Sequence, residues 1–157
     1  MHHLDLGLFH YQIEYTRELL KNLHGNSLND EIDRRLAKIP RFSGLKIFSN
    51  GIQSISRFTA DDYKNLMKVM VFVIDNLYNN QQNIERSVKN KDLTTLYQEW
   101  NEMYLISRYE EFSESDLKKF EVCIITNILL KYFLILRSIL KNYVNFRNQY
   151  IHGQNDL

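Results

Sequence analysis

The feature that most constrains the fold is a stripe of apolar residues within segment 59–77. Apolar side chains recur there at intervals of three and four residues, which places them on one face of an α-helix. Thr59, followed three residues later by Asp62, matches the capping box that begins many helices. The segment therefore predicts an amphipathic helix that starts at Thr59 and packs against other elements. The stripe consists of Leu66, Val69, Met70, Val73, Ile74 and Leu77.

Four further segments have the same helical period, and their ends carry recognisable signals. Gly25 follows the first segment where a C-terminal cap residue is expected, and Pro40 forces the end of the second. Asp92 is the predicted N-cap of the fourth helix, and Ser113 or Ser115 that of the fifth. The polar residues 79–91 predict a loop or a frayed helix. The predicted helical ranges are 6–23, 28–36, 92–109 and 113–146.

The connector 39–58 holds the only proline of the chain and two of its five glycines. The dipeptide Asn50-Gly51 is a strong hairpin signal. A two-residue turn there would nevertheless set every apolar side chain opposite a polar one, so we expect no regular hairpin. The sequence predicts a single all-α domain over 1–157, with about five helices in an irregular bundle. The connector is expected to attach to the core through Leu45, Ile47 or Phe48, and Ile52.

The chain lacks the common motifs of enzymes and metal sites. Gly44 and Gly51 are not followed by the Lys and Ser or Thr of a phosphate-binding loop, and no two histidines have the spacing of a helical metal site. Cys123, the single cysteine, is expected to be a small buried hydrophobe. We predict no catalytic, metal-ligating or cofactor-binding residues and no small-molecule substrate. An acidic run is expected to be solvated at a helix start, namely Glu110, Glu111, Glu114 and Asp116.

Charge is the one physical signal that points to a partner. The formal net charge of +1 gives no strong field over the whole molecule. Between residues 34 and 60, however, every charged residue is basic. Such a stretch can contact nucleic-acid phosphate, and an ordinary solvated face explains it as well. The candidate contacts are Arg34, Arg35, Lys38, Arg41, Lys46 and Arg57.

Segment 122–140 is apolar nearly all round and long enough to suggest a membrane span. Lys131 and Arg137 oppose this, since each costs about 2.5–3.5 kcal/mol near a bilayer centre. We therefore predict a helix, 122–146, that is buried or covered by a partner or a second copy. The N-terminus has no basic segment followed by an apolar core, so no signal peptide is expected and an intracellular location, nuclear or cytoplasmic, is predicted. The predicted partner contacts are Leu130, Phe133 and Leu134.

Residues 1–121 resemble the central part of Plavaka/KDZ-type transposases, which are DDE-class, RNase H-like cut-and-paste enzymes. The most specific part of the likeness is a pattern of the form R…P.(F/Y).GL..F.NGI……(T/W)(T/A)..Y..(L/M).KV. It is matched here by Arg35, Pro40, Phe42, Gly44, Leu45, Phe48, Asn50, Gly51, Ile52, Thr59, Tyr63, Met67, Lys68 and Val69.

The resemblance implies a piece of a DNA transposase without its catalytic centre. In that family, acidic residues hold metal ions for phosphoryl transfer. One acid lies just before the Met-His pair that Met1 and His2 match, and the others lie beyond the end of this chain. The pattern is lost in 122–157, which is rich in residues with A/T-rich codons. The resemblance predicts an inactive transposon remnant that retains some DNA contact. The alternative is a helical interaction module that associates through its apolar C-terminal helix.

Overall fold

The computed structural model describes residues 7–53, 55–78 and 88–128. Within these ranges the protein has helices and no strand, so the all-α prediction is confirmed. A last helical segment, residues 114–128, follows the named elements. The named elements are α1 (His10–His24), α2 (Ser27–Ala37), the short 3-10 helix η2 (Ile55–Arg57), α3 (Ala60–Ile74) and α4 (Asn90–Ile106).

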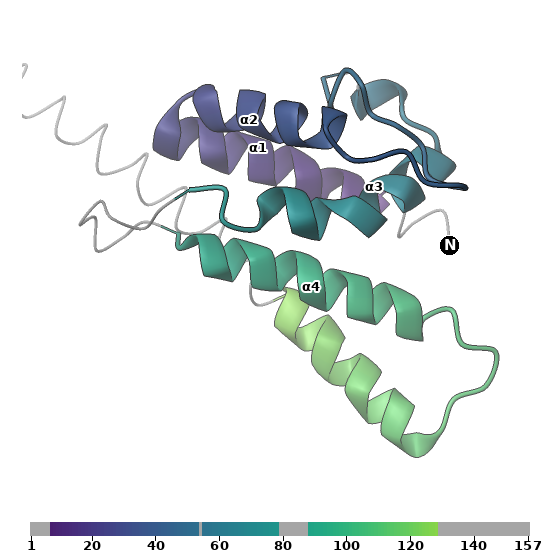
Figure 1. Ribbon diagram of the computed structural model, residues 1–157. Coiled ribbons are helices and arrows are strands. Elements are labelled where there is room, and N and C mark those ends of the chain that lie inside the picture. The colour runs from purple at the N-terminus through teal and green to yellow at the C-terminus, as the bar shows by residue number, and fades with distance from the viewer. Residues whose placement is uncertain (1–6, 54, 79–87, 129–157) are drawn as a thin grey trace, which may run out of the picture.

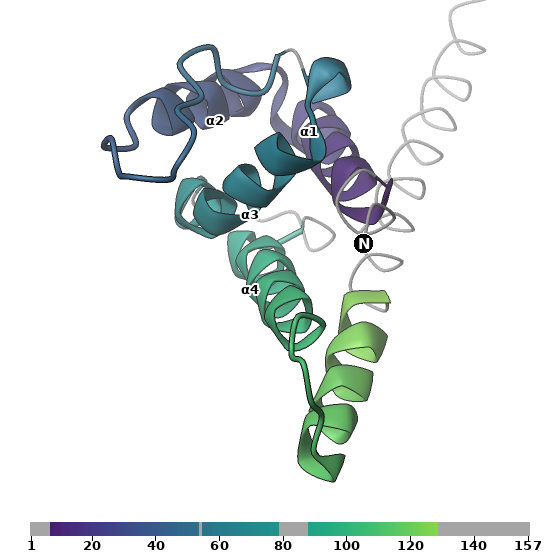
Figure 2. The same cartoon turned by 90° about the vertical axis from the view of Figure 1, so that its right-hand side faces the viewer.

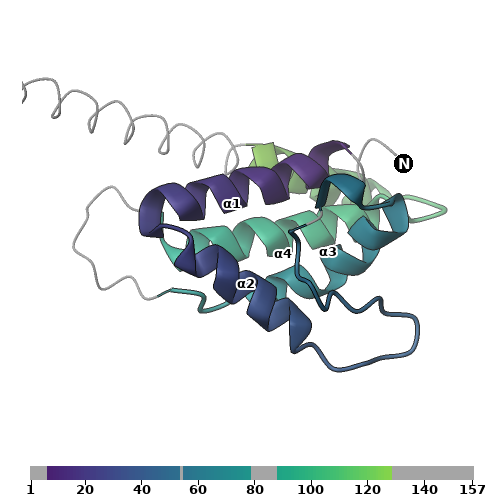
Figure 3. The same cartoon turned by 90° about the horizontal axis from the view of Figure 1, so that it is seen from above.

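The helices form an irregular bundle. Helices α1 and α2 pack side by side, and α3 packs against both α2 and α4 (Figure 1). Segment 114–128 lies against α4, on the side away from α2 (Figure 2). Seen from above, α1 runs roughly along α4, while α2 runs obliquely to both (Figure 3). The connector between α2 and α3 therefore closes one end of a three-helix unit.

Aromatic side chains fill the core where α1, α3 and α4 meet. Phe9, directly before α1, stacks on Trp100 with ring centroids 5.6 Å apart. Its edges and faces also meet Tyr63 at 6.4 Å and Tyr97 at 6.2 Å in T-shaped pairs. The Tyr97 hydroxyl donates to Thr16 Oγ1 at 3.0 Å, which gives this buried polar group a partner. These four aromatic side chains are therefore core residues, each at most 4% exposed.

Helix α3 begins as predicted and ends earlier than its apolar stripe. The Thr59 side chain accepts from the Asp62 amide, and Asp62 accepts in return from the Thr59 amide, which completes the capping box. The helix ends at Ile74, because Asp75 leaves helical geometry and Asn76 has a positive φ of 47°. Leu77 is buried all the same, since the chain after the helix turns back onto the core.

Helix α4 begins two residues before the predicted cap. Asp92 is not the N-cap: the helix starts at Asn90, and Asp92 lies in its first turn. The reason is tertiary, because buried Asn90 accepts through Oδ1 from the Leu77 and Tyr78 amides at 3.0 and 3.3 Å. The helix ends at Ile106, short of the predicted Tyr109. Sequence periodicity located the helix but not these long-range contacts.

Helix α1 begins at His10, later than the predicted residue 6, and the other predicted helix ends agree with the structure to within one residue. Gly25 ends α1 with a φ of +73°, and its amide donates to Lys21 O. Ser113, not Ser115, pairs with the Asp116 amide and carboxylate before segment 114–128. The predicted continuation of this helix to residue 146 lies outside the described residues. So do the side chain of Leu23, most of the predicted loop 79–91 and residues 1–6.

The connector is irregular, and helix side chains satisfy its polar backbone groups. The Ile52 amide donates to Asp33 Oδ1 on α2 at 2.8 Å, and Arg17 on α1 donates to Ile52 O at 3.3 Å. From α3, the Tyr63 hydroxyl donates to Ile55 O at 2.9 Å. Phe48 and Ile52 are buried, whereas Ile47 is exposed. The connector is therefore a joint between three helices, and no hairpin forms within it.

Gly51 makes this joint possible. Its φ is +61°, a region that L-residues other than glycine rarely adopt. A Cβ built at this position would lie 2.1 Å from Asp33 Oδ1 and 2.5 Å from Asp33 Cβ. The connector backbone can thus approach α2 closely only because Gly51 has no side chain. Gly44 also has a positive φ, of +76°, but a Cβ there would meet nothing within 4 Å.

Candidate functional site

The six candidate nucleic-acid contacts fall into two groups, and the first begins with two arginines held by one acid. Arg34 donates to Glu31 through Nε at 2.6 Å, and Arg35 donates to Glu31 through Nε at 2.8 Å. These bonds, first from Arg34 and then from Arg35, lower the pKa of Glu31 to about 2. Both guanidinium groups are thus paired with the Glu31 carboxylate, three and four residues earlier on α2.

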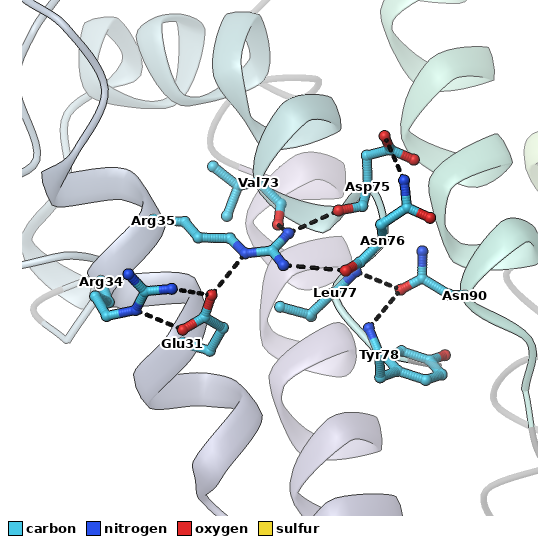
Figure 4. A network of polar contacts seen from close by, with 9 residues as sticks. All are labelled: Glu31, Arg34, Arg35, Val73, Asp75, Asn76, Leu77, Tyr78 and Asn90. Atoms are coloured by element: carbon cyan, nitrogen blue, oxygen red, sulfur yellow. Dashed lines mark hydrogen bonds and ion pairs between the residues drawn. The ribbon is translucent and has the colours of Figure 1, made fainter. Parts of the chain in front are cut away.

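Arg35 also closes the C-terminal end of α3. Its guanidinium donates to Val73 O at 3.0 Å, to Asp75 O at 2.6 Å and to Asn76 O at 3.0 Å (Figure 4). The last carbonyls of a helix have no partner within the helix and carry partial negative charge. The planar fork of arginine satisfies one of them, Val73 O, together with the carbonyls of the two residues that follow the helix. Arg35 therefore joins α2 to the end of α3, which is a structural role.

Lys46 is the third basic residue with a partner inside the protein. Its Nζ lies 2.5 Å from Asp62 Oδ1, the carboxylate that also caps α3. Burial favours the neutral acid and raises the pKa of Asp62. Hydrogen bonds from Lys46 and Thr59 outweigh that effect, so the net shift of the Asp62 pKa is downward. Lys46 thus ties the connector to the start of α3.

Lys38, Arg41 and Arg57 form the second group. All three are exposed, and they lie directly after α2, early in the connector and in η2. In the described part of the chain none of them forms an ion pair with an acid, and Arg41 is flanked by exposed Phe42. The positive charge available to an external phosphate is therefore smaller than the six-residue stretch suggests.

The predicted partner contacts Leu130, Phe133 and Leu134 lie outside the described residues. The preceding turns of the same helix are described, and they have two different faces. Cys123 and Asn127 are buried against the bundle. The opposite face exposes large apolar side chains to solvent: Leu117 at 48%, Val122 at 60%, Ile125 at 49% and Ile128 at 49%. We call these four residues the outer apolar face.

Cys123 lies beside two carboxylates of α4, an arrangement that sequence reasoning did not find. One ligand atom each from Cys123, Glu99 and Glu102 falls within 4.8 Å of the others. Lys119 Nζ lies 2.5 Å from Glu102 Oε1 and so already balances that charge. Burial first, and then the two carboxylates, raise the pKa of the Cys123 thiol. A protonated thiol is a poor metal ligand and a poor nucleophile, in agreement with the predicted structural role.

Comparison with known protein families, with curated proteins and with solved structures gives no match for this chain. The likeness to Plavaka/KDZ-type transposases therefore remains a prediction from the residues of its motif. Within the described residues, no helix is both long enough and apolar enough to cross a bilayer. Most of segment 122–140, for which a span was considered, lies outside those residues.

Proposed function

We propose that the chain is a helical interaction module that pairs with a second copy of itself through the outer apolar face, without catalytic activity of its own. The observation that carries this proposal is the exposure of Leu117, Val122, Ile125 and Ile128 along one side of a helix whose other side packs on α4. Contiguous exposed apolar patches mark association surfaces more often than isolated exposed residues do.

The sequence after residue 128 supports a second copy as the partner. Residues 129–140 are mostly Leu, Ile, Phe and Tyr, so the apolar character continues beyond the described helix. A stable interface buries about 800 Å² per partner, more than four side chains supply. The continuation, with Leu130, Phe133 and Leu134, would provide the rest. A two-fold axis lets one such stripe cover another without any different protein.

Self-association is testable with matched substitutions. Val122→Lys and Ile125→Lys place a charge on the outer apolar face and should convert a dimer to a monomer at the same concentration. Phe72→Lys makes the same chemical change at a 72% exposed site on α3 and should leave the dimer intact. Sedimentation velocity over a range of concentration and salt measures this. A monomer at every concentration, or equal effects of the three substitutions, contradicts the proposal.

DNA contact is a second candidate, favoured by the exposed cations Lys38, Arg41 and Arg57. Three phosphate contacts would give a salt dependence of binding with a slope of about −3 on a double-logarithmic plot. Replacing any one of them by alanine should reduce that slope by about one. Arg34→Ala, which removes a cation already paired with Glu31, is the matched control and should change it less. A DNA affinity that does not change with salt concentration would exclude DNA contact through these cations.

We also propose that segment 1–121 originates from the central part of a DDE transposase and 122–157 from other DNA. In support, many residues of the shared pattern have structural roles here, such as Gly51 in the joint, Thr59 at the cap and Arg35 at the end of α3. A pattern of this kind can outlast the loss of catalysis. The flanking genomic DNA tests the origin: related copies that encode residues 122–157 in one continuous transposase frame would contradict it.

A further inference from the structure

A cavity of about 220 Å³ lies between α1, α4 and segment 114–128. Six of the eight residues around it are hydrophobic. Leu8 and Ile128 are half exposed, so they form a rim that opens the cavity to solvent. The inner wall includes Trp100, which is stacked on Phe9 with ring centroids 5.6 Å apart and is thereby held in place. The other hydrophobic lining residues are Met103, Phe120 and Ile124.

The polar side chains of the lining offer an occupant almost nothing to bond with. Gln12 and Asn127 are only 2% and 6% exposed. The Asn127 amide donates to Cys123 O at 3.0 Å, within its own helical segment. Gln12 Nε2, Asn127 Oδ1 and the indole nitrogen of Trp100 are enclosed by protein atoms. The surface that faces the free space is therefore almost entirely apolar.

Water and ions are poor occupants of such a space. A buried water molecule normally makes about three hydrogen bonds to polar groups, which this wall does not present. None of the eight lining residues is charged, so an ionised group would lose its hydration without gaining an opposite charge. An apolar molecule, by contrast, gains free energy when its surface and that of the wall are removed from water. The cavity therefore favours an occupant without polar groups.

We propose that the cavity is a binding site for a small hydrocarbon of the size of an alkylbenzene. A cavity of about 150 Å³ is enough to bind benzene, so this one leaves room for a ring with a short alkyl chain. Trp100 and Phe120 provide ring surface for contact with an aromatic ligand. Met103 adds a thioether, a group that makes favourable contacts with aromatic rings.

Ethylbenzene is the probe, compared with benzamide, which has the same ring but an amide in place of the ethyl group. Ethylbenzene should bind to the full chain in a saturable manner and raise its unfolding temperature, because a ligand of the folded state stabilises it. Trp100 emission reports the binding, since it is the only tryptophan of the chain. Benzamide should bind at least about fivefold more weakly, because its amide loses hydration without gaining hydrogen bonds.

Substitutions at two neighbouring positions test the location, with helicity checked by circular dichroism. Ile124→Phe fills part of the cavity and should abolish ethylbenzene binding. Ile124→Ala enlarges the cavity and should shift the preference from ethylbenzene toward the larger butylbenzene. Ile125→Lys is the control: this residue lies on the outer apolar face and does not line the cavity, so binding should be unchanged.

Four results would overturn the proposal. They are the absence of saturable ethylbenzene binding, equal affinity for benzamide, binding that survives Ile124→Phe, and a preference that Ile124→Ala leaves unchanged. The last of these decides alone if Ile124→Phe does not fold. Loss of binding in Ile125→Lys would also overturn the proposal, because it would place the hydrocarbon on the outer apolar face.

Discussion

Gly51→Ala is the substitution whose cost can be worked out most directly from the structure. Two penalties are expected. A left-handed conformation costs an L-residue about 1–2 kcal/mol. The added Cβ also meets Asp33 at 2.1 Å from Oδ1, 2.3 Å from Cγ and 2.5 Å from Cβ. A new rotamer of Asp33 cannot relieve the last contact, because Cβ does not move when χ1 rotates.

The connector must therefore move away from α2, and the hydrogen bond from the Ile52 amide to the Asp33 carboxylate is lost. A hydrogen bond to a charged group contributes about 1.5–3 kcal/mol. The expected total is about 2.5–5 kcal/mol, a large part of the stability of an ordinary domain. Gly44→Ala isolates the first penalty, because Gly44 has a similar positive φ and open space around it, and should cost about 1–2 kcal/mol.

Urea unfolding followed by Trp100 emission measures both variants. A double-mutant cycle with Asp33→Gly, which removes all three clashing atoms, should lower the cost of Gly51→Ala to that of Gly44→Ala. If Gly51→Ala and Gly44→Ala differ by less than about 0.5 kcal/mol in the wild-type background, the close approach to Asp33 has no energetic weight. The reasoning about the joint would then be refuted.

Three other predictions concern the polar contacts. Arg35→Ala should lower the free energy of unfolding by about 2–3 kcal/mol, because the carbonyls of Val73, Asp75 and Asn76 lose their donor. Arg34→Ala, on the exposed side of α2, should cost much less. Thr59→Ala removes a capping box and should cost about 1 kcal/mol in the same assay. The folded pKa of Glu31, about 2, lies below its ordinary 4.5, so its contribution is present above pH 4.5 and is lost as the pH falls toward 2. Acid titration of wild type and Glu31→Gln should show this as a shallower loss of stability in the variant over that range.

The helices could be predicted from the sequence because their signals are local. The stripe in α3 and the Thr59 cap depend on residues within one or two turns, and both were correct. The start of α4 was predicted incorrectly, because Asn90 accepts hydrogen bonds from the Leu77 and Tyr78 amides, more than ten residues earlier in the chain. The cavity between α1, α4 and segment 114–128 was not foreseen, since its lining residues, among them Gln12, Trp100 and Asn127, come from three different helices.

The basic stretch 34–60 also could not be interpreted fully from the sequence, because the partners of its basic residues lie outside it. A count of charges between residues 34 and 60 omits Glu31, which stands just before that window and binds both Arg34 and Arg35. It also cannot show that Arg35 reaches carbonyls about forty residues further along the chain. Charge patterns identify which residues can contact phosphate, but only the fold shows which of them remain available.

The joint around Ile52 has a consequence for the order in which the protein opens. A loop normally exchanges its amide hydrogens with solvent far faster than the helices that it connects. The Ile52 amide donates a hydrogen bond to Asp33 on α2, and the Ile52 carbonyl accepts one from Arg17 on α1. The nearby Ile55 carbonyl accepts a hydrogen bond from Tyr63 on α3. Releasing that amide requires the connector to move away from α2, and the neighbouring carbonyl bonds to α1 and α3 oppose that movement. Helices α1 to α3 and their connector should therefore unfold as one cooperative unit, with a loop amide among its slowest-exchanging positions.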